Sequence, residues 1–241
     1  MTRMRKAVAA LAMVLGFATT AHAGDYNGNF MVRLQATGVI TQDDLNSLTS
    51  GATDLKAAGF DAEVSDRILP TATLTYFLTK NLGLELFCCF SKHKIDLKSP
   101  VAGIGGNVAE SWIFPPALTL TYHFDGMGAF KPYVGAGAQY VHFFSSDRGN
   151  NTLSADSVKF DDAFGVTVQA GFDLAIGGGW YLNADIKKSW LDTTVTWRNS
   201  TVTGADIVAK ADIDPLIVSV GVGYRFNLED LFGRRQVESL K

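Results

Sequence analysis

The stretch Asp-Ile-Asp-Pro-Leu-Ile-Val-Ser-Val-Gly-Val-Gly-Tyr-Arg-Phe, residues 212–226, decides the fold class of this chain. From Leu216 to Phe226 every even-numbered residue is apolar or aromatic, whereas the odd-numbered residues from Ser219 onward are serine, glycine, glycine and arginine. Successive strand side chains point to opposite faces, so this period of two predicts one strand with an apolar face and a small, polar face. The run is longer than an ordinary strand of ~5–6 residues and can cross a bilayer when tilted. Because the chain ends soon afterwards, we expect this last strand to pair with the first and close a membrane β-barrel.

Residues 1–23 have the pattern of a secretory signal peptide. Arg3, Arg5 and Lys6 precede an apolar run at residues 7–18, and Ala-His-Ala at residues 21–23 is a small-x-small cleavage site. Its removal leaves 18 basic against 24 acidic residues, a balance that argues against nucleic acid as a partner. The remaining chain has no run of the ~18 apolar residues that a transmembrane helix needs. An exported chain of this kind is either soluble or crosses a membrane as a closed barrel.

Seven further segments alternate in the same way, at about residues 29–40, 67–79, 82–95, 111–124, 130–144, 160–176 and 180–196. Their connections alternate between long polar segments, at 41–65, 96–110, 145–159 and 197–211, and short turns such as the glycine triplet at 177–179. Within the first long loop, Asp43 is expected to cap a short helical turn over Leu45 and Leu48. Short turns at one end and long loops at the other are typical of bacterial outer-membrane barrels. We predict an all-β fold, an eight-stranded antiparallel transmembrane β-barrel at residues 24–226, followed by a periplasmic C-terminal tail at 227–241.

Alternation alone does not say which face meets lipid, because a soluble eight-stranded barrel shows the same pattern with its apolar face inward. A water-facing exterior is normally rich in Lys and Glu. Here the polar face is mainly Gly, Ala, Thr, Ser, Asn and Gln, which suits a narrow, filled interior. Aromatic residues gather at both strand ends: Phe30, Tyr122, Phe124, Trp180, Tyr224 and Phe226 toward the short turns, and Phe90, Trp112, Phe114, Tyr140, Phe164 and Trp190 toward the long loops. Two such girdles favour a membrane barrel.

Seven segments carry a family resemblance. They are Leu-Thr-Tyr at 74–76 with Asn-Leu-Gly-Leu-Glu-Leu at 81–86, Lys-His-Lys-Ile at 92–95, Phe-Pro-Pro-Ala-Leu-Thr-Leu at 114–120, Phe-Lys-Pro-Tyr-Val-Gly-Ala-Gly at 130–137, Leu-Asp-Thr-Thr at 191–194, Asp-Pro at 214–215 and Val-Gly-Tyr-Arg-Phe at 222–226. In this order they resemble the outer membrane protein W (OmpW) family over nearly all of the mature chain. The resemblance implies a Gram-negative outer-membrane barrel with a hydrophobic lumen, proposed to pass small hydrophobic molecules. Family members usually end at the aromatic matching Phe226, part of the signal for the barrel-assembly machinery, whereas this chain continues to Lys241.

Inward-facing positions divide by height into a polar set and an apolar set. The polar set lies near the short turns, close to His123 and Gln169, and comprises Arg33, Glu85, Asp173, Asp185, Lys187 and Arg225. The apolar set lies nearer the loops and comprises Val39, Leu69, Phe87, Cys89, Ile113, Pro115, Val141, Leu191, Ile213 and Ile217. Ordinary filling of a small barrel explains any single residue, but the gradient as a whole indicates more. Buried charges must pair, which predicts a polar plug. The apolar upper lumen predicts a binding site for an apolar molecule.

These patterns predict a transport barrel rather than a water-filled pore, because an eight-stranded interior is only wide enough for its own side chains. A molecule entering from the loops should contact Phe87, Ile113, Leu191 and Ile217 and then leave sideways into the membrane. Proline removes a ladder hydrogen bond, so prolines 115, 116 and 215 mark possible lateral openings. The expected partners are outer-membrane lipid, small hydrophobic molecules and the barrel-assembly machinery, with both termini in the periplasm. No catalytic residue, cofactor or metal ligand is expected.

Two alternatives remain open. A structural or receptor barrel would bind a host, phage or bacteriocin through its long loops and would require no ligand in the lumen. A rim lipid hydrolase would use His142 with Ser145 or Asp147, and its activity would be lost in His142→Ala. Cys88 and Cys89 are adjacent, so they point to opposite faces of a strand, and we expect no disulfide between them.

Overall fold

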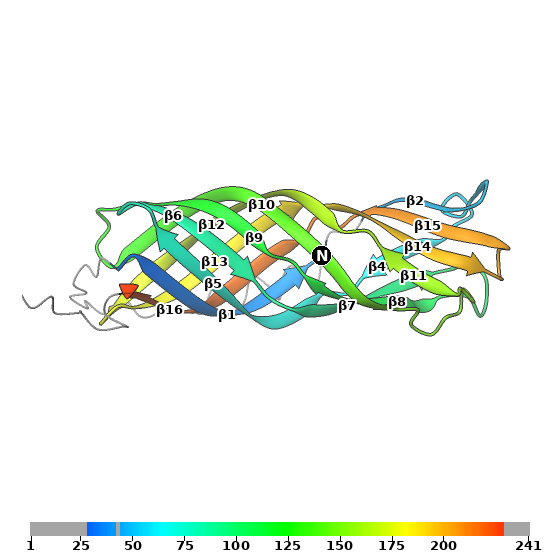
Figure 1. Cartoon of the computed structure of the whole chain (residues 1–241), viewed down its shortest axis with the longest axis horizontal. Helices are drawn as coiled ribbons and strands as arrows, with labels where there is room; N and C mark the ends of the chain where they lie inside the picture. Colours follow the sequence, from blue (N-terminus) through cyan, green and yellow to red (C-terminus); the bar gives the residue numbers. More distant parts are fainter. Residues whose placement is uncertain (1–27, 42–43, 229–241) are drawn as a thin grey trace, which may run out of the picture.

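The computed structural model describes residues 28–41 and 44–228. The predicted signal peptide and residues 229–241 of the predicted C-terminal tail lie outside these ranges. Eight strands form a closed antiparallel barrel (Figure 1). They are β1 (Phe30–Ile40), β5 (Arg67–Phe77), β6 (Leu82–Cys88), β9 (Ala117–His123), β10 (Phe130–Asp147), β12 (Ala163–Gly177), β13 (Trp180–Trp190) and β16 (Leu216–Phe226). Each strand pairs with the next along the chain, and β16 pairs with β1. The predicted eight-stranded antiparallel barrel is confirmed.

The closure of the barrel uses the whole of the last strand. Phe30 lies opposite Phe226 and Ile40 opposite Leu216, with every residue between them paired and no shift of register. An unbroken ladder leaves neither strand with an exposed edge, so the backbone polar groups of both are satisfied within the barrel.

The two faces of the wall differ as a membrane requires. Large apolar side chains project outward, with exposed fractions of 62% at Leu34, 50% at Leu118 and 70% at Phe164. Polar side chains point inward and are buried, among them Arg33 and Thr121 at 0%. A soluble barrel would have the opposite arrangement, so the lipid-facing interpretation is confirmed. In the part of the chain that the structure describes, no helix is long and apolar enough to cross a membrane.

The long connections are not the polar loops that we predicted. They contain paired strands that continue the barrel wall outward along its axis (Figure 1). These strands are β2 (Asp44–Ser50), β3 (Thr53–Asp54), β4 (Asp61–Val64), β7 (Ser91–Lys98), β8 (Gly106–Phe114), β11 (Ser157–Phe160), β14 (Asp192–Ser200) and β15 (Ala205–Asp212). One group runs in the order β10-β8-β7-β4 and the other in the order β11-β14-β15-β2-β3. We call these strands the extension.

The extension has its own apolar core, which explains why its segments form strands. Leu48, Val108, Trp197 and Ile207 are each no more than 2% exposed and belong to one cluster. Their sequence neighbours are mostly polar and face outward. The overall polar composition of these segments therefore gave no indication that their apolar residues alternate as in a strand. The predicted helical turn over Leu45 and Leu48 is wrong, because both residues lie on β2. A shift of register against β15 between Leu45 and Ser47 lets these two residues, three positions apart, pack into the same core. Asp43, the predicted cap of that turn, lies outside the described residues.

Candidate functional site

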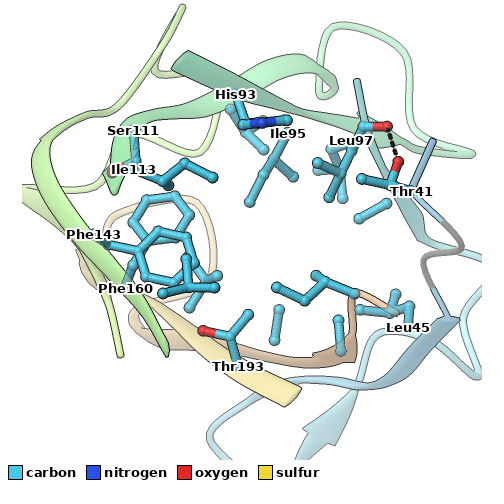
Figure 2. Close-up of a pocket in the computed structure, with 18 of the residues that line it drawn as sticks. Thr41, Leu45, His93, Ile95, Leu97, Ser111, Ile113, Phe143, Phe160 and Thr193 are labelled. Carbon is cyan, nitrogen blue, oxygen red and sulfur yellow. Dashed lines mark hydrogen bonds between the residues drawn. The ribbon is translucent and has the colours of Figure 1, made fainter. Parts of the chain in front are cut away.

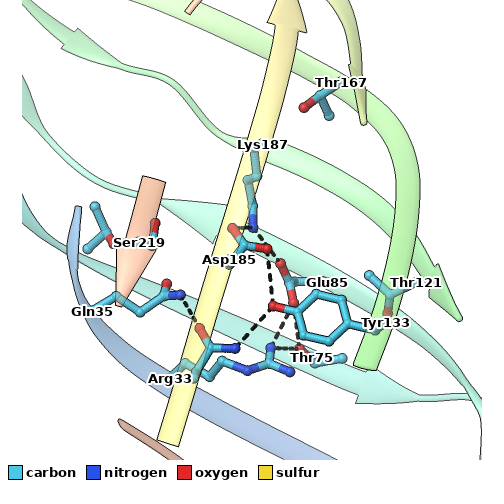
Figure 3. A network of polar contacts seen from close by, with 12 residues as sticks. Arg33, Gln35, Thr75, Glu85, Thr121, Tyr133, Thr167, Asp185, Lys187 and Ser219 are labelled. Atoms are coloured by element: carbon cyan, nitrogen blue, oxygen red, sulfur yellow. Dashed lines mark hydrogen bonds and ion pairs between the residues drawn. The ribbon is translucent and has the colours of Figure 1, made fainter. Parts of the chain in front are cut away.

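A network of buried ion pairs crosses the barrel in its lower half, toward the short turns. Arg33 of β1 binds Asp173 of β12 through two nitrogens, at 2.9 Å and 2.6 Å. It also donates to Glu85 of β6 at 2.7 Å, as Figure 3 shows. These three strands are not consecutive around the barrel, so the side chains bridge its lumen. The forked guanidinium is suited to this geometry because it can serve two carboxylates at once.

Lys187 of β13 continues the network. Its Nζ lies 2.5 Å from Asp185 and 3.2 Å from Glu85, and all three side chains are no more than 1% exposed. The Tyr133 hydroxyl donates to Asp185 at 3.1 Å and accepts from Asn183 at 3.1 Å. We call Arg33, Glu85, Asp173, Asp185 and Lys187, with Tyr133 and Asn183, the polar network.

Tyr133 and Asn183 were not among the residues predicted for the polar plug, although strand parity could have identified both. Each lies at an inward position, as Gly135 and Asp185 do on the same strands. The ring of Tyr133 reaches across because its neighbour on β12 is Gly171, where a Cβ would come within 2.6 Å of the tyrosine Cζ. A side chain at residue 171 would therefore displace the ring.

Arg225, which we predicted with this set, lies apart from the polar network. Its Nε donates to the carbonyl of Gly28 at 2.7 Å, and its guanidinium lies 3.7 Å from the centre of the Phe77 ring. His123 stacks on Tyr133, with ring centres 4.8 Å apart. Arg225 therefore belongs to the mouth at the short-turn end of the barrel rather than to the ion-paired layer.

A layer of buried hydroxyl groups lies on the inner face of the wall, beside the polar network. Thr37 bonds Thr71 at 2.6 Å and Ser219 at 2.9 Å. On the opposite side Ser189 bonds Thr167 at 3.0 Å and Gln139 at 2.5 Å. Each of these contacts joins different strands, so the layer ties the wall together from within.

An apolar cavity of about 140 Å³ begins above this layer and extends into the extension (Figure 2). Phe87, Ile113, Leu191 and Ile217, the four predicted contacts, all line it. Of the other predicted apolar residues, Val39, Cys89, Pro115, Val141 and Ile213 also line it, whereas Leu69 is buried against the wall beside Phe87. The structure thus brings the predicted apolar set together.

The upper part of the cavity wall comes from residues that sequence analysis assigned to loops. These include Leu48, Phe60, Val108, Trp197 and Ile207. Phe143 and Phe160 stack side by side at 5.2 Å on one wall, joining β10 to β11 (Figure 2). The cavity continues to Val202 and Thr203, in the turn between β14 and β15. It is therefore longer than the barrel pattern alone indicated.

The arrangement around His142 differs from the one that the rim-hydrolase alternative required. The His142 Nδ1 lies 2.9 Å from Asp162, and neither Ser145 nor Asp147 is a partner of its ring. Asp162 also accepts from the Tyr140 hydroxyl at 2.5 Å, and these two contacts lower the pKa of Asp162 to about 2. His142 is about half exposed on the outer surface, stacked between Tyr140 and Phe144. The arrangement is an aromatic surface stripe without an adjacent nucleophile.

The wall is interrupted at prolines 115 and 116, beside the cavity. The β6–β9 ladder ends at Phe87 and Ala117, and the β7–β8 ladder begins at Ser91 and Ile113. Residues 88–90 and 114–116 fall between them. The other side of the same segment stays bonded to β10, because Tyr140 donates its backbone N–H to the carbonyl of Pro116 at 2.9 Å. The interruption is thus one-sided.

The profile described as "OmpW family" matches residues 26–226. The chain belongs to the OmpW family. It is an outer-membrane barrel of a Gram-negative bacterium, as the relatives in this family are.

Three relatives are similar in sequence to this OmpW-family chain. An outer-membrane protein, y4mB, of Sinorhizobium fredii is 34% identical, covering 82% of this chain and 80% of that one. Outer membrane protein W of Vibrio cholerae is 28% identical, covering 92% and 100%. A dibenzothiophene metabolism operon protein, PahQ, of Pseudomonas aeruginosa is 31% identical, covering 46% of this chain and 50% of that one.

Two solved structures resemble this OmpW-family barrel. The crystal structure of OprG from Pseudomonas aeruginosa has a TM-score of 0.77 and 26% identity, covering 85% of this chain and 98% of that chain. The solid-state NMR structure of AlkL in DMPC lipid bilayers has a TM-score of 0.65 and 25% identity, covering 89% and 98%.

Proposed function

We propose that this barrel takes up small apolar molecules from outside the cell and releases them sideways into the outer membrane. The observation that carries the proposal is the apolar cavity, which continues from Val202 down to Phe87 and Ile217 and ends above the polar network. An enclosed apolar surface of this kind is what an apolar ligand requires. The association of the relative PahQ with a dibenzothiophene metabolism operon supports the same class of molecule.

Lateral release follows from the position of the polar network beneath the cavity. An apolar molecule that crossed the network would exchange its apolar contacts in the cavity for contacts with ion-paired groups, which cannot solvate it. The interrupted ladder beside Cys89 and Pro115, both of which line the cavity, supports an exit at that height. Fewer ladder hydrogen bonds have to break there than elsewhere in the wall.

The test of the proposed function is uptake of a hydrophobic fluorescent tracer by lipid vesicles containing the purified protein. Vesicles without protein set the background, because apolar tracers also cross lipid unaided. Vesicles with the protein should take up the tracer faster, and equal rates would overturn the proposal. A receptor barrel that binds only through its extension would give equal rates.

The proposed orientation of the barrel predicts where a protease added to intact cells can cleave the chain. With both termini in the periplasm, surface protease on intact cells should cut only at the tips of the extension, within residues 51–59, 99–105, 148–156 or 201–204, where the strands turn. Paired backbone elsewhere in the extension resists proteases. Mass spectrometry of the released peptides identifies the sites. Cleavage at Gly177–Gly179 would instead place the short turns outside the cell.

Neutralising the lower lumen should open it to ions. In Asp185→Asn with Lys187→Gln, two of the buried charges that hold the polar network are lost, and Glu85 loses one of its cations. Single-channel conductance in planar bilayers should rise several-fold. The matched control removes Asp161 and Lys159, an ion pair at 2.7 Å whose side chains are more than half exposed, and should leave conductance unchanged. A wild type that already conducts small ions freely would contradict closure by the network.

A further inference from the structure

Polar side chains that reach the cavity direct their hydrogen bonds into its wall. Each donates to a backbone carbonyl: Thr41 to Val64 at 3.0 Å, Ser111 to Phe144 at 3.3 Å, Gln139 to Pro115 at 3.3 Å, Thr193 to Asp161 at 2.6 Å, Thr203 to Ala205 at 3.1 Å and Trp197 to Val108 at 2.9 Å. A hydroxyl or indole whose single proton is already shared has no donor for a ligand, and the amide of Gln139, which has a second N–H, is only 2% exposed. The wall therefore behaves toward a ligand much as hydrocarbon does.

Ser91 and His93 are the remaining polar pair in the lining, and both lie on β7 at inward positions (Figure 2 shows His93). His93 Nδ1 lies 3.2 Å from the carbonyl of Ser65, and its Nε2 lies 2.9 Å from the Ser91 hydroxyl. A carbonyl can only accept, so Nδ1 must carry the proton. In the neutral ring Nε2 is then an acceptor, and Ser91 must donate to it.

The neutral form of His93 is the one expected at pH 7. Burial lowers the pKa of His93 below its ordinary value of 6.5, and nearby Arg67 lowers it further, against the opposing effects of the Ser65 carbonyl and Asp66. The proton of Ser91 is therefore held by His93 under ordinary conditions. This pair decides whether the lumen offers a donor, because Ser91 would present its hydroxyl to the cavity if His93 did not accept it.

We propose that the Ser91–His93 pair makes the cavity selective for unfunctionalised hydrocarbons over molecules of the same size that carry a hydrogen-bond acceptor. The proposal rests on the proposed function and names its substrate class. A volume of about 140 Å³ suits a molecule of about one aromatic ring, since a dry cavity of ~150 Å³ binds benzene in another protein. A carbonyl group placed in this lining would lose its water partners and find no donor to replace them.

Ethylbenzene and acetophenone test the proposal, because they differ by a methylene replaced with a carbonyl. The full-length protein in detergent is equilibrated with radiolabelled ethylbenzene, each competitor is added, and affinities are calculated from measured aqueous concentrations. Wild type should prefer ethylbenzene by about 10- to 100-fold. In His93→Leu the Ser91 hydroxyl is freed, and the relative affinity for acetophenone should rise about three- to tenfold.

Ser91→Ala is the complementary variant, because it leaves the bare acceptor Nε2 of His93 facing the cavity. Its relative affinity for 1-phenylethanol, a donor, should rise, while that for acetophenone should not. The double variant should return to the wild-type preference. Ser157→Ala is the control, since that serine of β11 is exposed and does not line the cavity, and it should change neither ratio. The opposite signatures of the two single variants keep the test decisive even if one of them fails to fold.

The outcomes separate this proposal from the function on which it rests. An unchanged acetophenone ratio in His93→Leu, with ethylbenzene still bound, would overturn the selectivity and leave hydrocarbon uptake standing. Failure of the wild type to bind ethylbenzene at all would overturn both.

Discussion

Replacing Ile217 with aspartate is expected to reduce tracer uptake to the rate of vesicles without protein while the barrel remains folded. Ile217 is 3% exposed, lines the cavity and lies opposite Lys187 on the neighbouring strand. A carboxylate at residue 217 would bring water into the cavity floor, and an apolar ligand would then have to displace a hydrated charge. The barrel should tolerate the change because Lys187 is near enough to attract the new charge.

Phe87→Asp should act in the same way from the other side of the lumen, since the Phe87 ring lies 5.5 Å from the Lys187 Nζ. Ile217→Leu and Phe87→Leu are the matched controls, because they keep the lining apolar and should retain most of the uptake. Heat-dependent mobility on gels reports whether each variant is folded. Undiminished uptake in both folded aspartate variants would show that the tracer does not pass through this cavity.

Replacing Arg33 with methionine should destabilise the barrel by about 3–5 kcal/mol, the loss typical when one member of a buried ion pair is removed. Arg33 is fully buried, and its removal leaves Asp173 and Glu85 without their shared cation. Asp173 is then left without a cation and Glu85 keeps only Lys187, so the cost of burying these carboxylates is no longer fully offset. Urea unfolding of the protein in detergent micelles measures the loss.

The double variant Arg33→Met with Asp173→Asn should recover part of this stability, because it removes the carboxylate that has lost its cation. Lys98→Met is the control: its ion pair with Glu63 is more than half exposed on both sides, and its loss should change stability by no more than about 1 kcal/mol. A loss below about 1 kcal/mol in Arg33→Met itself would mean that the polar network does not stabilise the fold.

The number, order and facing of the barrel strands could be predicted because each depends on neighbours in the chain. A period of two assigns Arg33 inward and Leu34 outward without any knowledge of the partner strand. The same parity placed Phe87 and Ile217 in the lumen together with three charged residues. The position of each residue along its strand put Arg33, Glu85 and Lys187 nearer the short turns. Parity could also have identified Tyr133 and Asn183.

Contacts across the lumen could not be predicted in the same way. Parity puts Arg225 on the inner face beside Arg33, but it does not give the height at which each side chain ends, and Arg225 turns to Phe77 at the mouth. The hydrolase alternative required His142 to meet Ser145 or Asp147, which are close to it in sequence. His142 meets Asp162 instead, because β10 and β12 are adjacent strands.

The amino-acid sequence by itself determined that this chain forms a closed outer-membrane barrel with a charged lower lumen and an apolar upper lumen, because strand alternation is a local property. Only the tertiary structure decided that the long connections are strands and that their cores complete the cavity. Leu48, Val108 and Ile207 come from segments more than 50 residues apart, surrounded by polar neighbours. Burying these side chains stabilises the protein only after the extension strands have paired. No single segment of the sequence therefore indicates that its apolar residues are buried.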